Sequence, residues 1–247
     1  MCTVSWVYGG GGYQLLCNRD EKKTRLPGGN PKIRGVDGVR YVAPVDGDFG
    51  GSWIAVNEFG VTLALLSRHS VNLHGTESRG RIVMDLAGAR SVEEARRQLM
   101  GLDISRFAGF TLAALEPRQP ASLFEWDGQR LTHSNNAEHR MPLTSSSFDS
   151  EGVQMKRCQE FSKRARARNL DSGLLFEFHR SHGLPNGKAS AYSTCMHRPD
   201  AHTVNFTWID VSESDVRFFY SPAAPCQWAP GETVQLARKG NSLALCG

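Results

Sequence analysis

The chain has 247 residues, of which 40% are hydrophobic and 22% are charged, and its formal net charge is +4 at pH 7. This composition is that of a globular protein and excludes a disordered chain. The small net charge argues against nucleic-acid or membrane-surface partners, and no apolar run reaches the roughly 18 residues that span a bilayer.

No repeat, low-complexity segment or linker divides the sequence, so we predict a single domain over residues 1–247. The segment MCTVSWVYGGGG lacks the basic region and the long apolar stretch of a secretory signal. We therefore expect a cytoplasmic protein with no transmembrane segment. A homo-oligomer is compatible with these features.

Two predicted hairpins begin the order of elements, with strands at 3–8, 13–17, 51–56 and 61–66. A glycine turn joins the first two strands, and its register brings Cys2 close to the end of the second strand, where the sequence reads NRDE at 18–21. Residues 22–50 carry glycine, proline and scattered charge, and we predict a long surface loop there.

Helices are predicted in the middle of the chain. Ser91 and Glu94 form a capping box for a helix that ends at Gly101, and further helices are predicted at 150–169 and 174–182. We interpret the basic run at 163–168 as a solvated helix end rather than a nucleic-acid site. The remaining predicted strands lie at 110–115, 122–126, 192–196, 203–211, 216–220 and 233–237. This order of strands, helices and strands fits two sheets flanked by helix layers.

The cysteines lie far apart, at positions 2, 17, 158, 195, 226 and 246. No CxxC pair occurs, and none of the eight histidines has zinc-binding spacing with paired cysteines. We therefore predict free thiols and no metal site. His197, two residues after Cys195, is a candidate for a pocket wall, and Cys17 is predicted to be a buried strand residue.

Cys2 directly follows the initiator methionine. If Met1 is removed, one residue holds both a thiol and a free α-amino group, whose ordinary pKa values are about 8.5 and about 8. The amine can then take the thiol proton directly or through water. Cys2 is therefore a candidate nucleophile that carries its own base. A cysteine at this position means little alone, but the neighbouring NRDE segment strengthens the case.

Several motifs together match a known family. MCTV at 1–4 is followed by NRDE at 18–21, by Arg25 and Pro27, by GGSW at 50–53 and by LALL at 63–66. In these motifs the chain resembles the NRDE family, which includes the transport and Golgi organisation protein 2 homologues. The resemblance is clear over residues 1–85 and weaker beyond them.

The resemblance implies an α+β fold, the four-layer αββα sandwich of the N-terminal-nucleophile (Ntn) hydrolases, with distant kinship to choloylglycine hydrolases and penicillin V acylases. In those enzymes an N-terminal cysteine works beside an arginine and an aspartate that follow the second strand. By position and type, Arg19 would hold the thiolate of Cys2, and Asp20 would orient the α-ammonium or the substrate amide. Asn18 and Trp53, from the NRDE and GGSW motifs, are substrate-binding candidates. Taken alone, NRDE favours a turn held by local hydrogen bonds and an Arg–carboxylate pair, whereas taken together with Cys2 it favours an active site.

The chain departs from the family pattern after LALL, where Ser67-Arg68 replaces the Thr-Asn of many relatives. A later family segment reads Leu-Ser-Asn, and its nearest counterpart here is 143–145, which ends at Ser145, with Asn135 a little upstream. We treat Ser145 as a catalytic candidate and Ser67 and Asn135 as substrate-binding candidates. The oxyanion donor is left unassigned, and loss of one such donor costs on the order of a hundredfold in rate.

Two functions from different classes follow from the resemblance. The first is an Ntn hydrolase or acyltransferase that cleaves the non-peptide C–N bond of a small amide through a Cys2 thioester, without a cofactor. The second is a non-catalytic protein that uses the same pocket to bind and traffic haem or another amphipathic ligand, since members of the family have been linked to haem movement. A nucleic-acid-binding module, which would rest on the basic run alone, ranks last.

Overall fold

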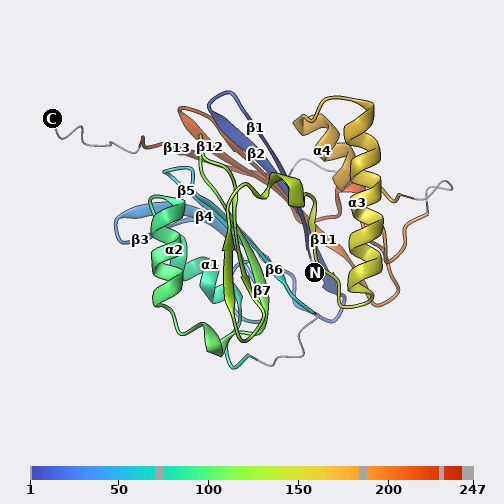
Figure 1. Cartoon of the computed structure of the whole chain (residues 1–247), viewed down its shortest axis with the longest axis horizontal. Helices are drawn as coiled ribbons and strands as arrows, with labels where there is room; N and C mark the ends of the chain where they lie inside the picture. Colours follow the sequence, from blue (N-terminus) through green and yellow to red (C-terminus); the bar gives the residue numbers. More distant parts are fainter. Residues whose placement is uncertain (1, 70–74, 184–187, 228–230, 241–247) are drawn as a thin grey trace.

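The computed structural model describes residues 2–69, 75–183, 188–227 and 231–240. Within them, two antiparallel sheets form the centre of the molecule (Figure 1). The first sheet has the strand order β10 (Leu143–Thr144), β1 (Cys2–Gly9), β2 (Gly12–Lys22), β11 (Ala201–Val211), β12 (Asp215–Ser221) and β13 (Glu232–Ala237). The second has the order β3 (Gly29–Val36), β4 (Val39–Val45), β5 (Ile54–Asn57), β6 (Thr62–Ser67), β7 (Phe110–Leu115), β8 (Ser122–Trp126) and β9 (Leu131–Ser134).

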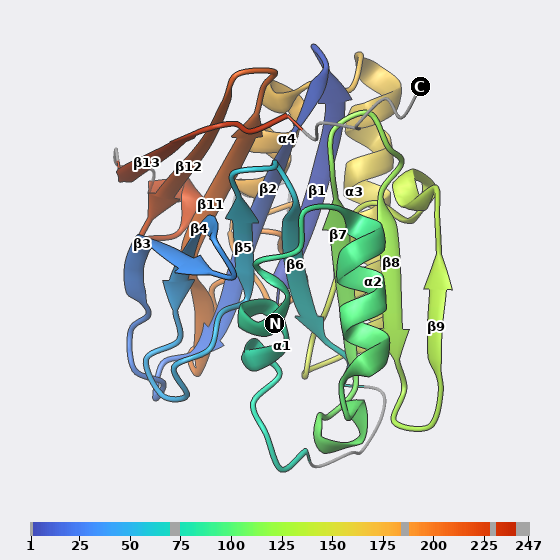
Figure 2. The same cartoon turned by 90° about the vertical axis from the view of Figure 1, so that its left-hand side faces the viewer.

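Helices cover the outer face of each sheet. Helices α1 (Gly80–Leu86) and α2 (Val92–Gly101) pack on the second sheet, and they lie in front of it in Figure 2. Helices α3 (Ser150–Ala167) and α4 (Ser172–His179) pack on the first sheet. One apolar cluster fills the space between the sheets, and one lies beneath each helix layer. The predicted α+β fold, an αββα sandwich, is confirmed.

Strands β1 and β2 are buried on both faces, because one face meets the other sheet and the opposite face meets α3 and α4. Cys2, Val4 and Trp6 point into the cluster between the sheets, whereas the alternate residues Thr3 and Ser5 contact the helix layer. Burial of one such apolar side chain contributes about 1.5–3 kcal/mol. The period of two in these strands therefore divides neighbouring residues between two different environments.

The predicted loop at 22–50 is wrong, because most of it forms the β3–β4 hairpin. Asp37 and Gly38 connect the two strands with φ values of +50° and +74°. A two-residue turn with positive φ at both positions matches the twist of a hairpin, and Asp-Gly is a favoured pair for it. The hairpin signal was thus present in the sequence but was masked by the surrounding charge.

Other predicted elements also differ from the structure. Residues 192–196 form turns rather than a strand, and the chain here bonds to strand β2 through the carbonyl of Thr194. The predicted helix at 174–182 ends at His179, and α1, β9 and β10 were not predicted. The capping of α2 is confirmed, since Ser91 Oγ accepts from Glu94 N at 3.1 Å.

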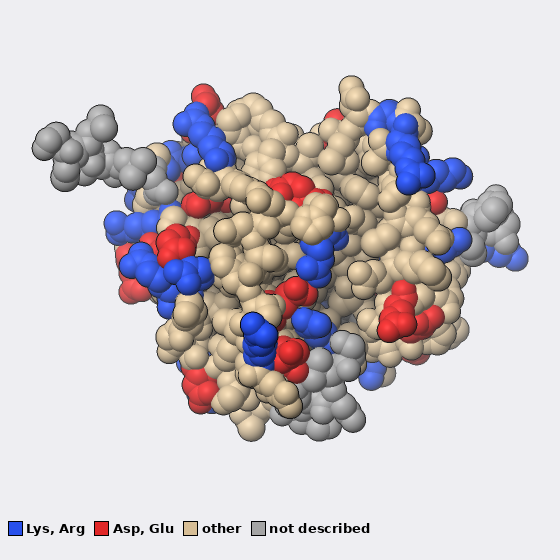
Figure 3. All heavy atoms as spheres, in the orientation of Figure 1, with Lys and Arg blue, Asp and Glu red and all other residues tan. Residues whose placement is uncertain are grey.

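Ion pairs accompany the basic run of α3. Arg164 pairs with Glu160 at 2.8 Å, and Arg168 lies 3.6 Å from Glu177 of α4. On the face drawn in Figure 3, the basic side chains (blue) and the acidic side chains (red) are interspersed. Across the part of the chain that the structure describes, no helix combines the length and apolar character needed to cross a membrane.

Candidate functional site

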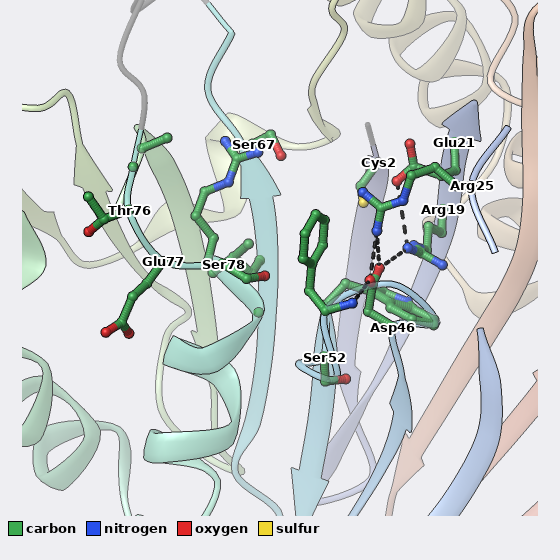
Figure 4. Close-up of a pocket in the computed structure, with 17 residues that line it drawn as sticks. Cys2, Arg19, Glu21, Arg25, Asp46, Ser52, Ser67, Thr76, Glu77 and Ser78 are labelled. Atoms are coloured by element: carbon green, nitrogen blue, oxygen red, sulfur yellow. Dashed lines mark hydrogen bonds and ion pairs between the residues drawn. The ribbon is translucent and has the colours of Figure 1, made fainter. Parts of the chain in front are cut away.

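A cavity of about 430 Å³ opens beside Cys2. Its walls come from the start of β1, the end of β2, the loop between β4 and β5, the end of β6 and segment 75–80 before α1. Figure 4 shows Cys2, Arg19 and Arg25 on one side and Thr76, Glu77 and Ser78 on the other. Segments that are distant in the sequence, with Ala108 before β7 among them, therefore meet around one thiol.

The hairpin register fixes the position of Cys2. It lies directly opposite Arg19 on the paired strand, and its side chain is 5% exposed. The backbone nitrogen of Cys2 donates to Ser145 Oγ at 2.9 Å, and the backbone nitrogen of Ser145 donates to the carbonyl of Cys2 at 3.0 Å. The structure thus brings together three predicted residues, Cys2, Arg19 and Ser145.

The surroundings of Cys2 favour its thiolate. A hydrogen bond with the Cys17 thiol is the largest cause that lowers the pKa of Cys2, and the Arg19 guanidinium acts in the same direction. Burial and the charge of Asp20 oppose this shift. The same hydrogen bond, together with burial, raises the pKa of Cys17 well above the ordinary value. Cys2 is therefore the more acidic of the two thiols, and the Cys17 thiol also donates to the carbonyl of Asn18 at 3.7 Å.

Arg19 is held in place by anions and by an aromatic ring. Its guanidinium pairs with Asp46, lies 3.6 Å from Glu21 and sits 4.1 Å above the Trp53 ring. Asp46 also accepts from Arg25 at 2.6 Å, so one carboxylate joins two arginines at the cavity wall (Figure 4). This arrangement limits the rotamers of Arg19 and keeps its charge beside the thiol of Cys2.

Asn18 and Asp20 point away from this cavity, into the helix layer behind β2. Asp20 accepts from Thr203 Oγ1 at 2.6 Å and from Arg157 Nη2 at 3.2 Å, and it is fully buried. Asn18 donates to the carbonyls of His179 and Thr194, both at 2.9 Å. Neither side chain lines the cavity, because residues that flank Arg19 in a strand must face the other side.

The remaining predicted residues divide between two places. Trp53 and Ser67 line the cavity. Asn135 does not: it accepts from Ser122 Oγ at 2.9 Å and lines a separate depression between α2 and the β8–β9 hairpin. Arg68, beside Ser67, lies 3.5 Å from Glu125 and lines another depression.

Asp46 and Arg79 are charged cavity residues that the sequence analysis missed. Asp46 lay in the wrongly predicted loop, where nothing distinguished it from other acidic residues. Arg79 precedes α1, lines the cavity and donates to the carbonyl of Gly109 at 2.9 Å. Burial lowers the pKa of Arg79, and the charges of Cys2 and Glu21 oppose that shift. A second cation therefore acts on the thiol from the wall formed by segment 75–80.

The family model described as Transport and Golgi organisation 2 matches residues 1–176, most of the chain. The chain belongs to this family. The match includes Cys2, the NRDE segment and all the cavity walls described above. No curated protein matches the chain.

Solved structures with the same fold are enzymes of low sequence identity. Penicillin V acylase from Agrobacterium tumefaciens is 14% identical, with a TM-score of 0.57 over 96% of this chain and 86% of that one. The Caenorhabditis elegans ortholog of N-acylethanolamine-hydrolyzing acid amidase is 14% identical, with a TM-score of 0.57 over 85% and 92%. A mutant of conjugated bile acid hydrolase from Clostridium perfringens is 12% identical, with a TM-score of 0.54 over 97% of each chain. The family member described here therefore has an Ntn-hydrolase fold.

Proposed function

We propose that this chain is an N-terminal-cysteine hydrolase or acyltransferase that cleaves the non-peptide C–N bond of a small amide. The observation that carries the proposal is the placement of Cys2 opposite Arg19 at the wall of a cavity, with its backbone nitrogen bonded to Ser145 Oγ. The named activities of the three similar structures, an acylase, an acid amidase and a conjugated bile acid hydrolase, support a hydrolytic reaction.

The proposed reaction begins after Met1 is removed. The free α-amino group of Cys2 takes the thiol proton, and Sγ attacks the carbonyl carbon of the amide. The C–N bond breaks as the amine leaves with that proton, and the acyl group remains on Sγ as a thioester. Water or an acceptor amine then attacks the thioester, and its proton returns through the α-amino group. Ser145 Oγ, which now accepts from the Cys2 nitrogen, would orient that amine.

The cavity also suggests the chemistry of the substrate. Its volume of about 430 Å³ suits a small molecule. Trp53, Phe49 and Leu65 supply apolar wall area, and Arg79 supplies a positive charge close enough to interact with Cys2. An amide that carries an acyl chain and an anionic group would match both features.

The test uses intact mass on the full chain. We expect the purified protein to lack Met1 and to form a covalent acyl adduct with N-acyl amides, and Cys2→Ala should abolish the adduct. Cys158→Ala is the matched control, because Cys158 is a half-buried thiol on α3 outside the cavity. Retention of Met1, or adducts that survive Cys2→Ala, would refute the proposed mechanism.

Binding of haem or another amphipathic ligand in the same cavity is the competing function. The cavity combines the Cys2 sulfur, a group that can ligate iron, with the Arg79 guanidinium, a group that can bind a carboxylate. Haem titration distinguishes the two functions. A Soret shift that is lost in Cys2→Ala, without acyl adducts from any amide, would favour ligand carriage over hydrolysis.

A further inference from the structure

Two histidines and two cysteines meet in the C-terminal part of the chain. His182 follows α4, Cys195 and His197 precede β11, and Cys226 lies in the short 3-10 helix η3 (Pro225–Gln227) after β12. The imidazole nitrogens and thiol sulfurs of these four side chains all lie within 4.8 Å of one another. None of the four lines the Cys2 cavity, and all lie beyond the residues matched by the family model.

The distances in this cluster resemble the edges of a metal tetrahedron. Zinc binds sulfur at about 2.3 Å and nitrogen at about 2.0–2.1 Å, which places tetrahedral S and N ligands about 3.6 Å apart. His197 Nε2 lies 3.5 Å from Cys195 Sγ and 3.3 Å from Cys226 Sγ. Since no pair in the cluster is more than 4.8 Å apart, the two sulfur atoms would need to approach by no more than about 1 Å to reach the roughly 3.8 Å edge of two sulfur ligands.

The burial and chemistry of the four groups suit a closed metal site. Cys195 is fully buried, and His182, His197 and Cys226 are half-buried. Two thiolates would neutralise a divalent cation, so the occupied site would place no net charge in the interior. A set of two sulfur and two nitrogen ligands in a tetrahedron selects zinc over the harder calcium and magnesium ions.

Backbone hydrogen bonds position the ligand-bearing segments. The nitrogen of Cys195 donates to the carbonyl of Ser181 at 2.9 Å, which ties the segment of His182 to that of Cys195. His197 forms a backbone bridge with His202 at the start of β11, and Gln227 N donates to the carbonyl of Ala224 at 2.9 Å across η3. Ligands on segments held in this way are preorganised for a metal.

We propose that His182, Cys195, His197 and Cys226 form a structural zinc site. Binding exchanges the two thiol protons for one Zn²⁺, and the protons leave to solvent. Because four protein ligands complete the tetrahedron, no position is left open for water or substrate, which distinguishes this site from a catalytic one.

The site lies directly behind the strand that carries Arg19. The carbonyl of Thr194, next to Cys195, accepts from Asn18 Nδ2 at 2.9 Å. The nitrogen of Met196 donates at 2.9 Å to Thr203 Oγ1, which donates to Asp20. A zinc ion here would crosslink the three segments that carry the ligands. Through these hydrogen bonds it would also connect them to the outer face of β2.

The test measures the metal content of the full chain, purified under reducing conditions from zinc-supplemented medium. We expect about one zinc per chain by inductively coupled plasma mass spectrometry. Cys226→Ser and His182→Ala should each lower zinc affinity by at least about tenfold in a chelator competition. Replacement of zinc by Co²⁺ should give the visible d–d bands of a tetrahedral site and thiolate charge-transfer bands in the wild type.

The matched controls are Cys158→Ser on α3 and His133→Ala on β9, which remove the same ligand types elsewhere. Both controls should retain zinc and the cobalt spectrum. The proposal is overturned if the reduced wild-type chain binds no zinc, if the controls lose zinc as the cluster variants do, or if the cobalt spectrum lacks thiolate bands. A Cys195–Cys226 disulfide in protein kept under reductant would also overturn it.

Discussion

Replacement of Arg157 by methionine tests how Asp20 is held behind the candidate site. Arg157 is 1% exposed, and its guanidinium donates to Asp20 Oδ2 at 3.2 Å and to Thr3 Oγ1 at 2.5 Å. Methionine preserves much of the side-chain volume but removes the charge. Asp20 would keep its hydrogen bond from Thr203 while its carboxylate loses the buried cation.

Breaking a buried ion pair by removing one partner costs about 3–5 kcal/mol, because the remaining charge is left uncompensated. With a urea dependence of about 3 kcal/mol per molar, the unfolding midpoint of Arg157→Met should fall by more than about 1 M. The control is Arg118→Met, since Arg118 and Glu213 form a 2.6 Å pair that is 70% and 66% exposed. A solvated pair of this kind contributes less than about 1 kcal/mol.

Urea unfolding of both variants, followed by fluorescence, measures the difference. The double variant Asp20→Asn/Arg157→Met should lose less unfolding free energy than the two single variants lose together. Each single variant removes one member of the buried ion pair and leaves the other in place. Equal midpoints for Arg157→Met and Arg118→Met, or strictly additive losses in the cycle, would refute the view that Asp20 acts as a buried structural partner of Arg157.

Three further predictions concern pH and metal. Cys17→Ala removes the largest cause of the lowered pKa of Cys2, so the pH midpoint for alkylation of Cys2 should move upward; an unchanged midpoint would contradict the assigned hydrogen bond. Burial and the charge of Arg157 lower the pKa of His179 to about 3, whereas the unfolded value is about 6.5. The unfolded chain therefore binds the proton first, and the free energy of unfolding should fall by about 1.4 kcal/mol per pH unit as the pH drops below 6.5. His179→Gln should flatten that slope in acid-range urea titrations, and an identical slope would exclude His179 as its source. At free zinc a thousandfold above Kd, bound metal adds about 4 kcal/mol, and a tenfold weaker site gains less, so a chelator should lower the thermal midpoint of the wild type by more than that of Cys226→Ser.

Strong local signals explain which parts of the fold could be predicted. The glycine turn and alternating strands of β1 and β2, and the Ser91 cap of α2, are encoded within a few residues, and each lies where it was predicted. The segment 192–196 has strand-like composition, yet its residues form turns: the carbonyl of Thr194 accepts from the Asn18 side chain, and the carbonyl of Met196 accepts from Thr203 N near the start of β11. That outcome depends on tertiary contacts that no local pattern contains.

Around Cys2, too, local sequence patterns predict only the contacts that a single hairpin determines. The hairpin register predicted that Cys2 would lie near the NRDE segment, because a tight turn determines which residues pair, and the structure places Cys2 opposite Arg19. Asp46 and Arg79 reach the cavity from loops whose paths depend on the packing of the second sheet, and neither belongs to a motif. The cluster of His182, Cys195, His197 and Cys226 was missed for a related reason: its members come from three segments, so their spacing in the sequence resembles no metal motif.

The alternation of β2 explains how a short motif can serve two purposes. Arg19 and Glu21 face the cavity beside Cys2, whereas Asn18 and Asp20 face the helix layer and bond to Thr194, His179, Arg157 and Thr203. A one-residue slip of the strand would exchange these two sets and would bring Asn18 or Asp20, in place of the guanidinium of Arg19, opposite Cys2. The buried contacts of Asn18 and Asp20 therefore oppose such a slip, and in that way they keep the charge of Arg19 at the thiol without touching the cavity themselves.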